Sequence, residues 1–256
     1  MSNPAAWPQA YGLSRHDSID STNEEARRLA AAGAPGPVWI VARRQTGGRG
    51  RRGRSWTSPP GNLYATLLIR PNAPVETCAQ LSFAAALAVG ETLAAYAPAA
   101  DIALKWPNDV LIGGRKASGI LLESAGGSAA ASVDWLAVGV GVNLAHYPPD
   151  TEFPATSLAA ALDCAPSQAP EPDDALARLA VRWAAWYDIW AMEGFGPLKN
   201  AWLARAAGLG RPLRARLARE EITGVFDGLD ESGALILRRP GGATIRVSAG
   251  EVFFPA

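Results

Sequence analysis

Short runs of apolar residues, separated by turns rich in glycine, proline and acidic residues, dominate the chain up to Gly208. Runs of strand length occupy residues 38–42, 62–70, 102–106, 110–112, 116–123 and 135–144. Apolar runs of this length between turn residues are typical of β-strands. The run at 135–144 is apolar almost throughout, as in a strand with both faces covered. The pattern therefore predicts several strands, one of which is buried.

Longer segments with helical signals lie between these runs. Polar and acidic residues at 20–25 form a helix start, and Gly33 follows the end of that helix at residue 32. The segment 75–97 is apolar around most of its circumference, which predicts a buried central helix. Further helices are expected at 173–192, 198–206 and 157–162. Loops are expected at 47–61, 124–132 and 148–172.

The composition changes after Gly208. Four short β-like runs follow, at 212–217, 221–229, 234–238 and 244–247. Tight turns with Asp, Ser, Pro and Gly separate them, which is typical of a small β-barrel. We therefore expect two domains, one over residues 1–207 and one over residues 208–256.

Composition and charge exclude several classes of protein. The 24 basic and 24 acidic residues balance, so the chain lacks the basic field that non-specific nucleic-acid binding needs. Two cysteines and two histidines are too few for a disulfide framework or a zinc site, which favours a reducing cytoplasm. The first ten residues do not form a signal peptide, and the apolar run at 81–97 is too short to span a bilayer. We expect a cytoplasmic protein without a membrane partner.

The lysines are rare and unevenly placed. The chain has three lysines among its 24 basic residues, and Lys105 and Lys116 lie eleven residues apart in polar motifs. An ammonium is a compact charge that fits beside a carboxylate or a single phosphate oxygen, whereas guanidinium favours a bidentate fork. Residues 45–56 add four arginines interspersed with four glycines, in the order Gln-Thr-Gly-Gly-Arg-Gly-Arg-Arg-Gly-Arg-Ser-Trp. Together these segments predict a site for an anionic, phosphorylated ligand.

The arginine-rich segment matches a nucleotide motif only in form. Residues 48–53 fit G-x-G-x-x-G, but a Rossmann turn needs a helix directly afterwards, and Pro59 and Pro60 follow instead. A P-loop is excluded because no Gly-Lys-Ser or Gly-Lys-Thr follows. The segment is better explained as a flexible loop whose arginines wrap an anion. A solvated basic loop or an RNA contact remains the alternative explanation for this segment taken alone.

Taken together, five segments resemble the signature segments of biotin protein ligases, in that family's order and spacing. They are residues 21–23, 45–56, 105–109, 115–121 and 139–143. The resemblance continues into the C-terminal β-module and so covers nearly the whole chain from about Ser18. It implies an α+β fold: a mixed or antiparallel sheet with packed helices, as in class II synthetases, followed by a small SH3-like barrel.

The resemblance implies a reaction in two steps. Biotin's carboxylate attacks the α-phosphate of ATP, giving biotinyl-5′-AMP and pyrophosphate, and a lysine of a biotin carboxyl carrier protein then takes the biotinyl group. Because the first step brings two anions together, a fixed cation must lie between them. The resemblance assigns that position to Lys116, with Arg51 on the closing loop. Asp109 is expected to orient the acceptor amine or accept its proton.

The resemblance also implies two sets of binding residues. Those for biotin are Ser21, Thr22, Asn23, Gln45, Arg49, Gly50, Arg51, Lys116 and Gly119. Those for the nucleotide are Arg51, Trp56, Asn108, Lys116 and Asn143. Trp56 is expected either to stack on the adenine or to pack in the core, and Lys105 either to act in the site or to anchor its strand through an ion pair. Mg²⁺ is expected with ATP, although the sequence shows no carboxylate cage for a metal.

Some questions stay open at the level of sequence. Only about twenty residues precede Ser21, so we expect no DNA-binding domain of the kind found in bifunctional members of the family, and no DNA partner. A monomer or weak homodimer is expected. The alternative functions are a lipoate or octanoate ligase or transferase of the same fold, a non-catalytic RNA-binding module, and a biotin sensor without turnover.

Overall fold

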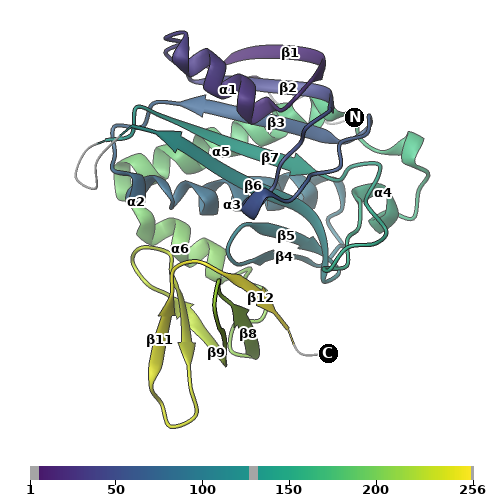
Figure 1. Cartoon of the computed structure of the whole chain (residues 1–256). Helices are drawn as coiled ribbons and strands as arrows, with labels where there is room; N and C mark the ends of the chain where they lie inside the picture. Colours follow the sequence, from purple (N-terminus) through teal and green to yellow (C-terminus); the bar gives the residue numbers. More distant parts are fainter. Residues whose placement is uncertain (1–5, 127–131, 255–256) are drawn as a thin grey trace.

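A computed structural model describes residues 6–126 and 132–254 of the chain. The larger part of the fold is one seven-stranded sheet with helices around it (Figure 1). The strands of this sheet are β1 (Gly12–Ile19), β2 (Val38–Gln45), β3 (Leu63–Ile69), β4 (Ile102–Lys105), β5 (Asp109–Ile112), β6 (Arg115–Ala125) and β7 (Trp135–Val142). The helices are α1 (Thr22–Ala31), α2 (Val75–Cys78), α3 (Leu81–Tyr96), α4 (Leu158–Ala161), α5 (Pro172–Glu193) and α6 (Phe195–Leu203), with short 3-10 turns at Arg51–Gly53 and Pro166–Gln168.

The strand order in the large sheet is β1-β2-β3-β7-β6-β5-β4. Only β1 and β2 run parallel, and every other neighbouring pair is antiparallel. The expectation of a mixed, mainly antiparallel sheet with packed helices is therefore confirmed. All seven residues of β3 are buried, and all but Thr66 are apolar or aromatic, as is typical of a central strand.

The two faces of the sheet are covered unequally. Helices α3 and α5 pack on one face and form the main core with it, whereas α1 packs on the other face against β2, β3 and β7 (Figure 1). The small second cluster beneath α1 contains Ala26, Ala30, Ile40, Leu68 and Ala137. Since α1 reaches only these strands, the same face over β5, β6 and the end of β7 is left for loops. That uncovered part of the sheet is where the candidate site forms.

The central helix was predicted as one element over residues 75–97, but α2 and α3 divide it at Ala79 and Gln80. The stretch Val75–Tyr96 is long and apolar enough to cross a membrane, the one such stretch in the described part of the chain. However, 67% of its most apolar window is buried inside the protein. It is therefore the core helix that its pattern predicted.

Two strands escaped prediction from sequence. Strand β1 lies at the edge of the sheet, where five of its eight residues are polar, and it pairs with β2 alone. Strand β12 (Glu251–Phe253) has three residues, too few for a periodic signal. The last helix before the C-terminal region also begins earlier than expected, at Phe195 instead of residue 198. Most of the predicted loop at 124–132 lies outside the described residues.

The C-terminal region forms a second, five-stranded antiparallel sheet in the order β11-β10-β9-β8-β12. Its other strands are β8 (Pro212–Arg216), β9 (Glu221–Leu229), β10 (Leu235–Arg238) and β11 (Thr244–Val247). The small β-domain predicted from the four runs is thus confirmed. It lies beside α6 and the β4–β5 hairpin (Figure 1), and the indole of Trp106 donates a hydrogen bond to Gly233 O at 3.0 Å. This contact brings β12 to the open face of the large sheet.

Candidate active site

A cavity of about 380 Å³ lies over the uncovered part of the large sheet. Its walls are the start of α1, the arginine-rich loop, strands β5 to β7, the segment 148–153 and β12. Thirteen residues predicted for the site from sequence line this cavity: Ser21, Thr22, Asn23, Gln45, Arg49, Gly50, Arg51, Trp56, Asn108, Asp109, Lys116, Gly119 and Asn143. The structure therefore brings together segments that are separated by up to 122 positions in the sequence, from Ser21 to Asn143.

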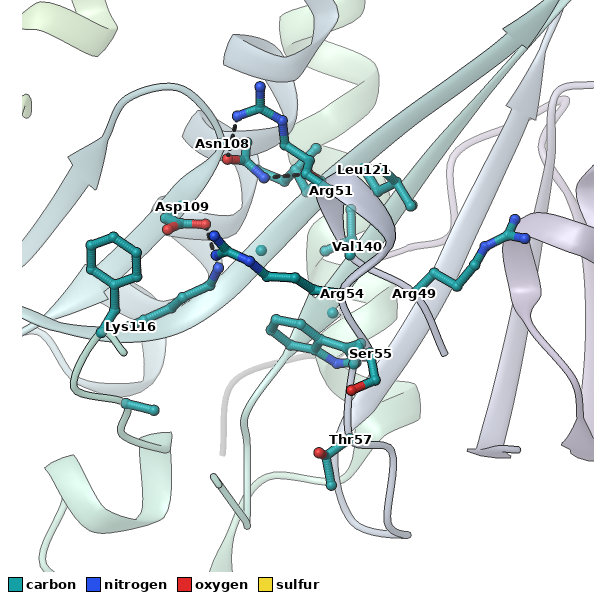
Figure 2. A pocket seen from close by; sticks show the side chains of 18 of the residues that line it. Arg49, Arg51, Arg54, Ser55, Thr57, Asn108, Asp109, Lys116, Leu121 and Val140 are labelled. Carbon is teal, nitrogen blue, oxygen red and sulfur yellow. Dashed lines mark hydrogen bonds and ion pairs between the residues drawn. The ribbon is translucent and has the colours of Figure 1, made fainter. Parts of the chain in front are cut away.

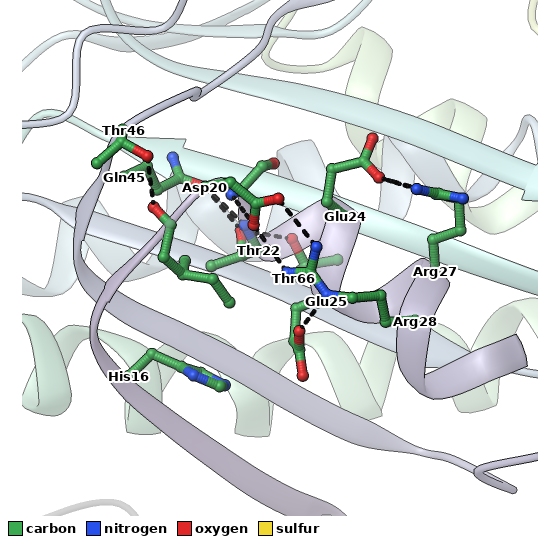
Figure 3. A network of polar contacts seen from close by, with 12 residues as sticks. His16, Asp20, Thr22, Glu24, Glu25, Arg27, Arg28, Gln45, Thr46 and Thr66 are labelled. Carbon is green, nitrogen blue, oxygen red and sulfur yellow. Dashed lines mark hydrogen bonds and ion pairs between the residues drawn. The ribbon is translucent and has the colours of Figure 1, made fainter. Parts of the chain in front are cut away.

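One end of the cavity is a neutral hydrogen-bond network around Gln45, at the end of β2 (Figure 3). The side-chain oxygen Oε1 accepts hydrogen bonds from the Thr22 backbone N at 2.9 Å and from the Thr22 hydroxyl at 3.1 Å. Its amide Nε2 donates to the Ser58 hydroxyl at 3.1 Å. Gln45 is thus fixed in one orientation, and it takes the place of a side-chain cap at the first turn of α1.

Asn23 is held as firmly beside Gln45. Its Oδ1 accepts a hydrogen bond from the buried Thr66 hydroxyl at 2.6 Å, and its Nδ2 donates to Glu123 Oε2 at 2.6 Å. A Cβ at Gly139 would lie 2.3 Å from Asn23 Oδ1, so only glycine at this position of β7 leaves room for the amide. The polar groups at this end are therefore aligned before any ligand binds, which reduces the entropy that binding costs.

The floor of the cavity is made of two glycines that face each other on neighbouring strands. Gly119 of β6 pairs with Gly141 of β7, and the Trp56 indole lies on both. A Cβ at Gly141 would lie 2.5 Å from the indole, and one at Gly119 would lie 3.1 Å from it. The indole Nε1 is buried and has no hydrogen-bond partner among the described residues. Trp56 therefore packs on the sheet between the two ends of the cavity.

The other end of the cavity holds a buried cluster of charge. Asp109, at the start of β5, is 7% exposed, and its Oδ1 lies 2.6 Å from the Lys116 ammonium. That oxygen receives no well-aligned hydrogen bond from the described residues, so the contact with Lys116 is ionic. Lys105, on the paired strand β4, places its ammonium 4.0 Å from the second oxygen of Asp109. Asp109 thus lies between two lysines.

Lys105 is 5% exposed and its ammonium lies 3.3 Å from the centroid of the Phe153 ring. Burial lowers the pKa of Lys105 from 10.5 to about 8; Asp109 opposes this shift and the charge of Lys116 adds to it. The aromatic face offers partial compensation to a desolvated cation. Keeping the charged Lys105 in the protein interior therefore costs free energy. A lysine that anchored its strand at the surface would not carry this cost.

The three cavity-lining arginines of the loop point in different directions (Figure 2). Arg51 donates to Asn108 Oδ1 at 3.2 Å, and Asn108 in turn donates to Ile120 O at 2.7 Å. Burial lowers the pKa of the Arg51 guanidinium. Arg51 thus reaches into the cavity and is positioned by Asn108. Arg49 and Arg54 flank it at the two ends of the loop.

Ion pairs fix both ends of this loop. Arg49 contacts Glu24 of α1 at 2.5 Å and Glu123 of β6 at 3.2 Å. At the far end, Arg54 contacts Glu251 of β12 at 2.5 Å and Glu152 at 3.7 Å. Although burial raises the pKa of Glu251, hydrogen bonds from Arg216 and Arg54 outweigh it, and the pKa is lowered. The loop therefore connects α1 to the C-terminal domain across the cavity.

The acidic partners of these arginines and the aromatic partner of Lys105 were not predicted from the sequence. These residues are Glu24, Glu123, Glu152, Phe153 and Glu251. Each is isolated in its own segment, so no local spacing marks it. The alternation of Gly139 and Gly141 on an apolar strand was the one local signal of close approach, because strand-interior glycine often marks it.

The described residues contain no group of three or more His, Cys, Asp or Glu side chains that could hold a metal. Asp109, the carboxylate at the centre of the charged end, is occupied by two ammonium groups. The residues present therefore do not form a magnesium site of their own. A magnesium ion that accompanies ATP would be bound chiefly by the phosphates.

With this geometry in view, the chain can be compared with known proteins. The pattern of the Biotin/lipoate A/B protein ligase family matches residues 16–143, and that of the biotin protein ligase C-terminal domain matches residues 208–254. A biotin–[acetyl-CoA-carboxylase] ligase of Paracoccus denitrificans is 48% identical over 92% of this chain and 97% of its own length. The corresponding ligase of Mycobacterium tuberculosis is 34% identical over 91% of this chain and 85% of its own.

Solved structures agree with these relatives. A biotin protein ligase from Aquifex aeolicus, in complex with biotin and ATP, has a TM-score of 0.78 and 29% identity, covering 94% of this chain and 97% of that one. Both the catalytic part and the C-terminal domain are included in this match. The chain therefore belongs to the biotin protein ligase family.

Proposed function

We propose that this protein is an ATP-dependent biotin protein ligase, which activates biotin as biotinyl-5′-AMP and transfers the biotinyl group to a lysine of a biotin carboxyl carrier protein. The observation that carries this proposal is the Lys116–Asp109 pair, at 2.6 Å, in the wall of the cavity that the arginine-rich loop encloses. The 48% identity to a biotin–[acetyl-CoA-carboxylase] ligase supports the same substrate pair.

In the first step, the carboxylate of biotin attacks the α-phosphate of ATP, and pyrophosphate leaves. Lys116 lies on the sheet wall and can place its ammonium between the carboxylate and the phosphate, where negative charge develops. Arg51 projects from the loop into the same cavity and would hold the phosphate opposite Lys116. Closure of the loop would exclude water, which otherwise hydrolyses the mixed anhydride.

We assign the neutral end of the cavity to the ureido group of biotin, which needs both donors and acceptors. Ser21, Thr22, Asn23 and Gln45 line this end, and the hydroxyls and amides there are already aligned. Arg49 and Gly50 on the loop, and Gly119 on the floor, would border the rings and the valeryl chain. Lys116 and Arg51 would meet the carboxylate at the charged end.

The nucleotide would lie toward the charged end and the C-terminal domain, against Arg51, Trp56, Asn108, Lys116 and Asn143. Asn143 is buried and donates to Thr156 O at 3.0 Å, so its role is to shape this wall. Trp56 would offer its free ring face to the adenine. Magnesium would arrive with ATP, and we assign no protein ligand to it.

In the second step, the lysine of the carrier attacks the adenylate and AMP leaves. The attacking amine must lose its proton, and Asp109 is the carboxylate of the cavity wall beside Lys116. Its Oδ1 has no well-aligned donor among the described residues, so it has capacity to orient or accept a proton. The carrier is the biotin-accepting subunit or domain of acetyl-CoA carboxylase or of another biotin-dependent carboxylase.

The decisive experiment is ATP–pyrophosphate exchange with the purified chain and biotin, lipoate or octanoate as the acid. Exchange that depends on biotin is expected. Exchange with lipoate or octanoate alone would transfer the protein to the lipoate branch of the family. No exchange with any acid, together with tight biotin binding, would indicate a sensor.

A variant separates the enzyme from the sensor more directly. Lys116→Ala should keep measurable biotin binding in a calorimeter while losing adenylation, because Lys116 stabilises the developing charge and does not contact the ureido group. Loss of both activities in a folded variant would contradict this division.

We further propose that the domain boundary lies at residues 207 and 208, in keeping with the C-terminal family match at 208–254. A cytoplasmic location follows from the reducing environment that two free cysteines favour. The expected absence of a DNA partner and the expected monomer or weak homodimer stay predictions, which sedimentation and DNA titration can test.

A further inference from the structure

The proposed reaction gives Lys105 no part, yet the chain buries this lysine at the charged end of the cavity. The residue is 5% exposed, and its ammonium is covered by the Phe153 ring and lies 4.0 Å from Asp109 Oδ2. A buried ammonium is unfavourable unless a partner compensates it. Its placement therefore demands an explanation beyond the packing of β4.

The two lysines take different oxygens of the same carboxylate. Lys116 contacts Oδ1 of Asp109 at 2.6 Å, whereas Lys105 faces Oδ2 at 4.0 Å. Of the two, Lys116 is the closer partner of Asp109. In the proposed reaction, however, Lys116 must direct its ammonium at the biotin carboxylate and the α-phosphate. One ammonium cannot serve both partners fully at the same time.

When Lys116 turns to the substrates, Asp109 would remain as a buried carboxylate without its main partner. A buried charge left in this way is strongly unfavourable, so Asp109 would pull Lys116 back from the substrates. Arg51 also acts on Asp109 through its charge, but Arg51 lies on the arginine-rich loop, which in the proposed reaction closes over the substrates. Lys105 is attached to strand β4, in direct register with Asp109.

We propose, on the basis of the proposed ligase function, that Lys105 is a positioning residue: it compensates the charge of Asp109 whenever Lys116 moves to the substrates, and so allows Lys116 to leave Asp109. Phe153 covers the Lys105 ammonium and limits its direct contact with substrate. Lys105 therefore acts through Asp109. Its contribution would appear in turnover more than in the affinity for biotin.

A double-mutant cycle tests this role in the biotin-dependent exchange assay. Lys105→Met is expected to lower the kcat of adenylation about tenfold or more in the parent chain. In the Asp109→Asn chain the same change should cost less than about threefold, because no carboxylate is left to neutralise. KM for biotin should stay within about twofold. An equal loss in both backgrounds would show that Lys105 is merely structural and would overturn the proposal.

Charge rescue provides a second measurement, which holds even if Asp109→Asn is too slow to assay. Lys105→Arg should recover most of the activity lost in Lys105→Met, since a cation again faces Asp109 Oδ2. An Arg variant that is as slow as the Met variant, with an unchanged melting temperature, would contradict the proposal. Lys199→Met is the matched control, because this third lysine lies outside the residues that line the cavity.

The pH dependence gives a signature that a purely structural lysine would not. The charged groups that act on Lys105 are Asp109 on β5, Lys116 on β6, Glu251 on β12 and Glu152. If Lys105 must be charged, kcat/KM for adenylation falls as pH rises through about 8 in the parent chain and stays level in Lys105→Arg. The same decline in both chains would count against the role. No biotin-dependent exchange in the parent would overturn the proposed function, and the role of Lys105 with it.

Discussion

The two ends of the cavity differ in how fully their polar and charged groups are paired within the protein. At the neutral end, Gln45, Thr22 and Asn23 have their hydrogen bonds satisfied by the protein itself. At the charged end, Asp109 and Lys105 are buried with incomplete compensation, and one oxygen of Asp109 lacks a well-aligned donor. A hydrogen-bond network whose donors and acceptors are paired holds one conformation, whereas a buried charge that is incompletely compensated is available for reaction. The comparison assigns recognition to the first end and chemistry to the second.

The largest effect should come from the charged end. Lys116→Met removes the cation between two substrate anions and should lower biotin-dependent adenylation by about 10³-fold, the scale seen for loss of one fixed electrostatic group. Pyrophosphate exchange measures this loss, and thermal unfolding shows that the fold persists. If the adenylation rate fell by less than about tenfold, the catalytic cation would lie elsewhere. The charged end would then not be the end that carries the chemistry.

The stability of the charged end should depend on pH in an unusual direction. Burial lowers the pKa of Lys105 from 10.5 to about 8, so between these values the unfolded chain binds the proton that the folded chain has lost. The free energy of unfolding therefore rises with pH across this window, by at most roughly 3 kcal/mol. The penalty is fully present below pH 8 and relieved above pH 10.5.

Denaturant titrations of the parent and of Lys105→Met at several pH values check this sign. The parent should gain stability relative to the variant as the pH rises, while remote groups cancel in the difference. A constant difference from pH 7 to pH 10.5 would show that Lys105 keeps its proton when buried.

At the neutral end, the expected effects are on binding. Gln45→Ala removes the acceptor of the Thr22 backbone N and leaves that buried donor unpaired. Loss of such a partner costs about 1–3 kcal/mol, so the Kd for biotin should rise about tenfold to a hundredfold while kcat changes little. Isothermal titration and steady-state kinetics separate the two quantities. A fall in kcat equal to the rise in Kd would mean that the ends are not separable.

The smallest effect should come from the lysine outside both ends. Lys199 forms an ion pair with Glu231, whose side chain is 86% exposed. Exposed pairs contribute about 0–1 kcal/mol, so Lys199→Met should change the melting temperature little and the exchange rate not at all. A large loss of activity in this variant would indicate that lysine replacement acts through global charge, and not through the cavity.

The charged end also shows how far local sequence patterns reach. Lys105, Asn108, Asp109 and Lys116 were identifiable because they lie within twelve residues of one another around a β-hairpin. Register explains their proximity, since Lys105 pairs with Asp109 and the next strand carries Lys116. The same nearness in sequence did not show that Lys105 would be buried beneath Phe153, which lies almost fifty residues further along.

The loop illustrates the opposite case. Its glycines and arginines predicted a flexible anion-binding segment, and Arg51 does enter the cavity. However, Arg49 and Arg54, which also line the cavity, are held in ion pairs by carboxylates from α1, β6 and β12. Nothing in the local pattern distinguishes the three arginines. Only the position of the C-terminal domain determines that Arg54 meets Glu251.

The sequence by itself predicted the strands and helices of the core and the small C-terminal β-domain, because apolar periodicity is a local property. The resemblance of its short motifs to a known family predicted thirteen of the residues that line the cavity. The tertiary structure alone decided the edge strand β1, the partners of Arg49 and Arg54, and the burial of Lys105. These features depend on contacts between segments far apart in the chain. Burial and electrostatic pairing arise from such contacts, so they became visible only in the folded protein.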